Sequence, residues 1–261
     1  MTSSAHGPSP ATGSDSGYGG FDAQEMVIVH RAFRRELRLL GELIAVVAPG
    51  DVGRAGVLAG HFADLHAGLL NHHHGEDELL WPLMLTRVGL ERDVVVRMEE
   101  QHERVARTLT AVAELVGRWA PVADAATRDR VVAALAEHRA VLVEHLDDEE
   151  AHLLPLAERY LTAKEFGALG EHFVLNTPKT KLFTYFGMVM EDADARERAI
   201  MLGNLPAPVR LIWRLVGPAV YARAVRRVRV RPDRLPGMRP ASAPRALGER
   251  GARTCAGRVR R

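Results

Sequence analysis

The chain has 261 residues, of which 47% are hydrophobic and 26% are charged, proportions that are ordinary for a soluble globular protein. Aromatic residues make up only 5%, and the abundance of Ala, Leu, Arg and Glu favours helices over sheets. No run approaches the length of about 18 apolar residues that a spanning helix needs, so membrane insertion is not expected. The single cysteine, Cys255, has no internal disulfide partner, and we expect a reduced, cytoplasmic setting.

Charge is distributed unevenly along the chain. The segment from Arg223 to Arg261 contains thirteen arginines and two acids, a net charge of +11, which leaves −9 for the remainder of a chain whose total is +2. We expect residues 231–261 to form a basic, disordered tail and residues 1–20 a disordered leader. The tail has no interleaved aromatic residues and no recognisable binding motif, so the sequence does not favour a nucleic-acid partner.

Helical periodicity extends from about residue 22 to residue 160 and is interrupted three times. The interruptions lie at residues 49–51, 88–90 and 121–124. Asp124 is a candidate N-cap for the segment that follows the third interruption. Because short connections make neighbouring helices antiparallel, the sequence predicts an all-α fold, an up-down-up-down four-helix bundle over residues 21–160.

The next part of the chain, residues 161–230, is expected to be a helical extension packed on the bundle. Thr162 and Glu165 have the spacing of a capping box, which predicts the start of a new helix. Four prolines follow, and they predict helices that are short or interrupted. These prolines are Pro178, Pro206, Pro208 and Pro218.

An internal repeat relates the two halves of the predicted bundle. Residues 72–83 and 145–156 share a His, a Glu four residues later, and then Leu, Pro and Leu, at an offset of 73. His30 in the first helix corresponds to His102 in the third at an offset of 72. Two such helix pairs can pack about an approximate twofold axis, and a site on that axis would receive matching groups from both halves.

Six polar residues interrupt the apolar stripes of these helices and form the predicted site. They are His30, His72, Glu76, His102, His145 and Glu149. Residues four apart share one helix face, so each His-x3-Glu pair presents an imidazole and a carboxylate to a common point. Burying such groups is costly unless cations lie among them. Nitrogen and oxygen ligands without thiolate suit Fe, Mn or Zn, and two carboxylates can bridge a pair of metals.

Several assignments near this site leave alternatives. His73 with Asp77, or His74 with Glu78, would also be four apart, and His72 is preferred because it fits both the apolar stripe and the repeat. Three other histidines are whole heptads from these positions, and they are either hydrogen-bond partners of the ligands or polar residues at the bundle ends: His66, His138 and His152. Three acids are expected to face solvent: Glu103, Asp148 and Glu150. Two prolines are expected to stop or kink their helices: Pro82 and Pro155.

The ordered set of histidines and glutamates resembles the hemerythrin-like, HHE cation-binding family, and residues 72–83 are particularly similar to its bacterial members. The resemblance implies a non-haem centre of two iron ions bridged by the two glutamates and by an oxo or hydroxo group. Oxygen-carrying members have a further histidine where this chain has Ala106, which puts simple oxygen transport in doubt. The expected function is binding or sensing of oxygen, nitric oxide, peroxide or iron; the alternatives are an enzyme that consumes peroxide or nitric oxide, and a scaffold that binds a protein partner through the basic tail.

Overall fold

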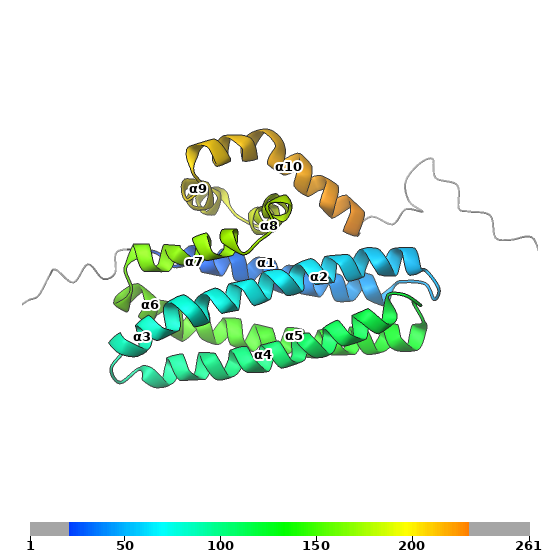
Figure 1. Cartoon of the computed structure of the whole chain (residues 1–261), viewed down its shortest axis with the longest axis horizontal. Coiled ribbons are helices and arrows are strands. Elements are labelled where there is room, and N and C mark those ends of the chain that lie inside the picture. Colours follow the sequence, from blue (N-terminus) through cyan, green and yellow to red (C-terminus); the bar gives the residue numbers. More distant parts are fainter. Residues whose placement is uncertain (1–20, 230–261) are drawn as a thin grey trace, which may run out of the picture.

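The computed structural model describes residues 21–229, so the predicted leader and tail lie outside the described residues. The described part is all-α, as predicted, and contains no strand. Four long helices form the bundle: α1 (Gln24–Ala45), α2 (Val52–Gly75), α4 (Arg92–Trp119) and α5 (Ala125–Asp148). Consecutive long helices run in opposite directions (Figure 1), and α1 and α4 each pack against both α2 and α5.

The helix breaks form where the sequence predicts them, and two of them are fixed by side-chain caps. The carboxylate of Asp51 accepts the backbone N–H of Arg54 at 2.9 Å, and that of Asp124 accepts the N–H of Thr127 at 2.8 Å. The predicted N-cap at Asp124 is therefore confirmed. Gly50 has a positive φ of 81° and donates its N–H to the carbonyl of Ala123 at 3.0 Å, which joins the two loops at this end of the bundle.

A π-helical turn interrupts each of the two helices that carry a His-x3-Glu pair. The turn η1 (Glu76–Leu80) connects α2 to α3 (Trp81–Arg87), and η2 (Glu149–Leu153) connects α5 to α6 (Leu154–Tyr160). Each turn starts at the repeated glutamate, whose carbonyl accepts the N–H of the residue five positions later.

The prolines that follow these turns explain their shape. Pro82 and Pro155 are each the second residue of the continuing helix. A proline has no N–H, and its ring excludes the carbonyl four residues earlier, so the chain widens into a π turn. Neither proline stops its helix, because both helices continue for another turn or more beyond them, so that part of the expectation is corrected.

Four further helices make up the extension: α7 (Ala163–Leu175), α8 (Lys179–Glu191), α9 (Ala195–Gly203) and α10 (Ala207–Arg229). They cover one side of the bundle, with α7 on α2, α8 and α9 on α1, and α10 on α8 (Figure 1). The capping box of Thr162 and Glu165 is confirmed at the start of α7. Contrary to the expectation of short or interrupted helices, α10 continues through Pro218. The carbonyl that loses its partner belongs to Arg214, and both residues are exposed, so water can replace the missing bond.

The extension is locked to the bundle by a close approach between α8 and α2. A methyl group added at Gly68 would lie 2.8 Å from the ring of Tyr185, so only glycine allows this contact. The Tyr185 hydroxyl donates to the carbonyl of Asp64 at 2.6 Å. Within residues 21–229, no helix is both long and apolar enough to cross a bilayer.

Candidate metal centre

A layer of histidines and glutamates crosses the bundle between two apolar clusters. One cluster fills the bundle towards the α1–α2 and α4–α5 loops and includes Leu40 and Leu109. The other lies beyond the layer and includes Trp81 and Met98. Every one of these four apolar side chains is at most 2% exposed, so buried apolar side chains lie on both sides of the polar layer.

The first group of ligating atoms comes from α1, α2 and η1. His30 Nε2 lies 3.1 Å from His72 Nε2, and His72 Nε2 lies 3.2 Å from Oε1 of Glu76. His30 and Glu76 are fully buried, and the side chain of His72 is 9% exposed. One ligating atom from each residue lies within 4.8 Å of the others, so the three could hold one metal ion.

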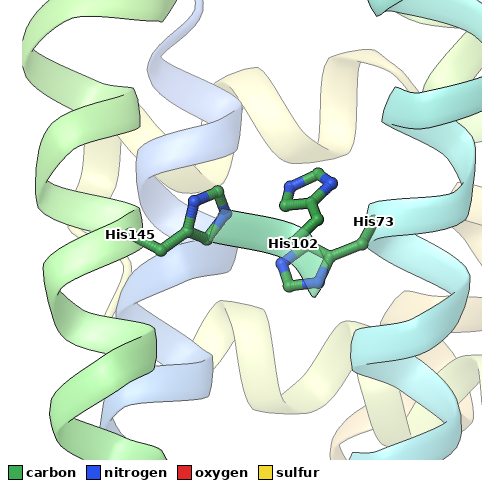
Figure 2. A group of neighbouring side chains, drawn as sticks. All are labelled: His73, His102 and His145. Atoms are coloured by element: carbon green, nitrogen blue, oxygen red, sulfur yellow. The ribbon is translucent and has the colours of Figure 1, made fainter. Parts of the chain in front are cut away.

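The second group consists of three buried imidazoles from α2, α4 and α5, which point towards one another (Figure 2). The ring centroids of His73 and His102 are 4.2 Å apart, and those of His102 and His145 are 4.7 Å apart. Their ligating nitrogens also lie within 4.8 Å of one another. This group could therefore hold a second metal ion.

The two glutamates connect the groups. Glu76, which belongs to the first group, also places Oε2 3.5 Å from Nε2 of His102 in the second. Oε2 of Glu149 lies 3.4 Å from Nε2 of His30 and 3.7 Å from Nε2 of His145. Each carboxylate thus faces histidines of both groups, which is the placement that a carboxylate bridging two metals requires.

Except for Nε2 of His30 and Nε2 of His72, which lie 3.1 Å apart, the atoms that face the centre of this layer have no hydrogen-bond partners. The unsatisfied buried atoms are both carboxylate oxygens of Glu76 and of Glu149, and Nε2 of His73, His102 and His145. Leaving a buried polar atom unpaired costs about 1–3 kcal/mol, and a charged group costs more. Seven such atoms in one place are therefore best explained by cations that they coordinate, and the residues fit the metal pair that the sequence predicts.

Burial and mutual repulsion shift the pKa values of several groups in the metal-free layer towards the neutral forms. Burial, followed by the neighbouring histidines, lowers the pKa of His145 to about 2 and holds the pKa values of His72 and His73 well below the usual range. Burial, followed by the charges of Glu149 and Asp77, raises the pKa of Glu76 well above its ordinary value. Metals bind neutral imidazole and ionised carboxylate, so we expect metal binding to release protons from the glutamates.

The outward-facing nitrogens of three ligating histidines are held by hydrogen bonds. Nδ1 of His30 lies 2.9 Å from Oε1 of Glu150, and Nδ1 of His102 lies 2.7 Å from Oδ1 of Asp77. Nδ1 of His145 lies 3.1 Å from Oε1 of Gln101. An Nδ1–H donated outward leaves the Nε2 lone pair for a metal.

One partner in these hydrogen bonds corrects an expectation from the sequence. Glu150 was expected to face solvent, but its side chain is only 24% exposed and bonds both His30 and Arg34. Asp148 is also mostly covered and pairs with Arg97, whereas Glu103 is 78% exposed, as predicted. Glu150 and Asp77 each directly follow a repeated glutamate, so the repeat could have identified both as hydrogen-bond partners of ligating histidines.

All six residues selected from the sequence lie in this layer, together with one more. His73 occupies the second group although the repeat favoured His72, and His74 points away and is exposed. Ala106 contributes no ligating atom, but His73 raises the number of imidazoles in the layer to five. Adjacent helical residues are about 100° apart, and both can face a bundle interior that is wide enough for two ions.

The three histidines that lie whole heptads from the predicted ligands are not among the ligating groups of the layer. His138 is fully buried among apolar residues and bonds Thr108, so it is not at a bundle end. His66 is partly exposed and packs against Phe62. His152 is 59% exposed and pairs with Asp148.

Comparisons with known proteins agree with the geometry of the layer. A family model described as the hemerythrin HHE cation binding domain matches residues 23–157, which is just over half of the chain. The match begins before α1 and ends within α6, so it covers the whole bundle and every residue of the layer. Searches of curated proteins and of solved structures returned no match.

Proposed function

The chain belongs to the hemerythrin family of HHE cation-binding domains, and on this premise we propose that its polar layer binds two iron ions. The observation that carries the proposal is the set of seven buried nitrogen and oxygen atoms that lack hydrogen-bond partners. His30, His72 and Glu76 would hold one ion. The other would be held by His73, His102 and His145, with Glu149 and Glu76 facing both. Mn or Zn would also accept these ligands.

We further propose that the iron pair binds or senses a small molecule such as oxygen, nitric oxide or peroxide, or reports the availability of iron. A bound iron pair supplies redox chemistry and coordination of small ligands that no side chain provides. The buried titratable groups facing the centre are all candidate ligands, and their outer partners Glu150, Asp77 and Gln101 bond those ligands. No described side chain in the layer is left over as a general acid or base, which favours a binding protein over an enzyme.

Iron analysis of four proteins tests the metal assignment. We expect the wild type, purified after iron-replete expression, to contain two irons per chain. His72→Ala and His73→Ala are each expected to lower that content, whereas His74→Ala is the matched control because this adjacent histidine is exposed. Circular dichroism reports whether each variant remains helical. Less than about one iron in the wild type, or equal content in all four folded proteins, would refute the assignment.

Optical spectra test the proposed role. We expect the iron-loaded protein to have a near-ultraviolet band that changes stoichiometrically when oxygen, nitric oxide or peroxide is added. Continuous consumption of peroxide or nitric oxide that His102→Ala abolishes would instead identify an enzyme. A spectrum that none of these molecules changes would leave iron binding itself as the function.

A further inference from the structure

Helix α10 exposes an unusual number of large apolar side chains. Among the described residues, twelve large apolar side chains are exposed, and six of them lie on α10. We call these six the α10 patch: Val209, Leu211, Ile212, Leu215, Val216 and Val220. Leu215 is 73% exposed and Leu211 is 59% exposed. A contiguous apolar surface of this kind marks an interaction site, whereas apolar residues exposed singly are normal.

The patch is not the result of a loosely placed helix. The opposite side of α10 is packed on α8, where Trp213 meets the ring of Phe186 at a centroid distance of 4.7 Å. A methyl group at Gly187 would lie 2.3 Å from Tyr221, so the two helices are in close contact. Arg229 donates to Glu36 of α1 at 2.6 Å and fixes the end of α10 to the bundle. The patch therefore faces outward from a fixed element, although Val220 at its edge also lines the pocket between α10 and the bundle.

Arginine accompanies the patch along the same helix. α10 contains six arginines and no acidic residue. Arg223, Arg226 and Arg227 are exposed, and among the described residues none of them forms an ion pair. Val216, Val220, Arg223 and Arg227 follow one another at spacings of three or four, so the exposed face changes from apolar to basic towards the end of the helix.

We propose that α10 binds the surface of an anionic membrane. The helix would lie along the interface, with the α10 patch between the lipid headgroups and the arginines beside the phosphates. This differs from membrane insertion, for which no described helix is suitable. Long arginine side chains can extend to the phosphates while their stems remain among apolar groups.

Charge disfavours two other occupants of the same face. A second copy docked face to face would bring Arg223, Arg226 and Arg227 of each copy against a helix that has no acid to pair with them. The segment that follows α10, residues 230–261, has nine arginines and two acids, so its charge also repels this helix. Anionic lipid is complementary to both properties of the face, since it offers phosphates to the arginines and acyl chains to the apolar side chains.

Vesicle flotation with the full-length protein tests the proposal. We expect binding to phosphatidylcholine vesicles that contain about one third phosphatidylglycerol, little binding to pure phosphatidylcholine, and a bound fraction that falls with added salt. Leu211→Ser/Leu215→Ser should weaken binding by about tenfold or more because two apolar anchors are lost. Arg226→Glu/Arg227→Glu should weaken it at least as much.

Matched substitutions elsewhere serve as controls. Leu90 and Leu175 are 99% and 83% exposed, so Leu90→Ser/Leu175→Ser removes equivalent apolar surface outside α10. Arg107 and Arg118 are 67% and 58% exposed, so Arg107→Glu/Arg118→Glu reverses equivalent charge. Neither control should change binding by more than about twofold. Helicity and iron content, measured for every variant, show whether the bundle is intact and keep this test separate from that of the metal centre.

Three results would overturn the proposal. One is the absence of binding to anionic vesicles at low salt. Another is full binding by Leu211→Ser/Leu215→Ser, because charge alone would then suffice. The third is a particle mass that halves in Leu211→Ser/Leu215→Ser by light scattering, which would assign the patch to a second copy of the chain.

Discussion

Replacing His138 with leucine should make the bundle more stable in acid. His138 lies within the apolar cluster on the loop side of the metal layer, and it is fully buried. The Thr108 hydroxyl lies 3.0 Å from the carbonyl of Val105, to which it can donate, and 2.9 Å from Nδ1 of His138. With that donation, Nδ1 must carry the proton, which leaves Nε2 as a buried acceptor without a partner.

The magnitude follows from the pKa of this imidazole. Burial, followed by the charge of His66, lowers the pKa of His138 from 6.5 to about 4. As the pH falls below 6.5, the unfolded chain takes up a proton that the native protein excludes until the pH approaches 4, so native stability declines over that interval. At pH 5 the loss is about 2 kcal/mol, and at pH 7 it is negligible. Leucine has similar bulk, no proton to bind and no unpaired nitrogen.

Urea unfolding of metal-free wild type and His138→Leu, followed by helical circular dichroism at pH 7 and pH 5, measures this difference. We expect the difference in the free energy of unfolding, variant minus wild type, to increase by about 2 kcal/mol from pH 7 to pH 5. This expectation does not depend on how stable the variant is at pH 7. His74→Leu, at an exposed position, should retain the pH dependence of the wild type. Parallel pH profiles for wild type and His138→Leu would show that the imidazole does not titrate as its surroundings require.

Three further outcomes test the site and the fold. Asp77→Asn should weaken iron binding by about 10- to 100-fold, measured by competition with a chelator, because the carboxylate orients His102. Gly68→Ala should destabilise the protein by about 1–3 kcal/mol, because the added methyl group clashes with Tyr185. Gly60→Ala should stabilise it by about 0.5–1 kcal/mol, because a methyl group there meets nothing within 4 Å. Urea unfolding measures both differences. Removing iron should lower the free energy of unfolding by at least about 3 kcal/mol, and the melting temperature should rise with the concentration of free iron. A melting temperature that does not change with iron would contradict binding to the native state.

Local sequence signals predicted the helix starts that side-chain caps determine. Asp124, and the pair of Thr162 and Glu165, cap helices through bonds that span only three residues. The course of α10 through Pro218 was not predictable in the same way, because it depends on packing against α8 and on solvent access to a carbonyl. Periodicity and caps therefore place helices, but tertiary contacts decide whether a proline ends one.

The candidate site was predicted from symmetry, and the missed ligand breaks that symmetry. The repeat selects one histidine in each His-x3-Glu segment, and the residue that corresponds to His73 at the offset of 73 is the apolar Leu146. The repeat therefore argued against a residue whose burial and stacking on His102 only the assembled bundle reveals. A similar limit applied to Glu150, since its bond to His30 joins residues 120 positions apart.

The same broken symmetry makes the two proposed metal positions unequal. The group with His73 has three imidazoles, whereas the other has two and a carboxylate. Gln101 bonds His145, but its counterpart at the offset of 72 is Val29, which has no side-chain acceptor to orient His72. The two-histidine position thus has fewer nitrogen ligands and less support from hydrogen bonds.

We therefore expect a chelator to remove the two irons in two kinetic phases of equal amplitude. The faster phase would correspond to the position of His30 and His72, because it has one imidazole fewer and its ligands are less constrained. His73→Ala removes the additional imidazole and should bring the slower rate closer to the faster one, whereas His74→Ala should leave both rates unchanged. Stopped-flow absorbance with a coloured iron chelator resolves the phases. If both irons leave the wild type in a single phase, the inequality seen in the ligands has no consequence for the metals, and the site is better described as a symmetric pair.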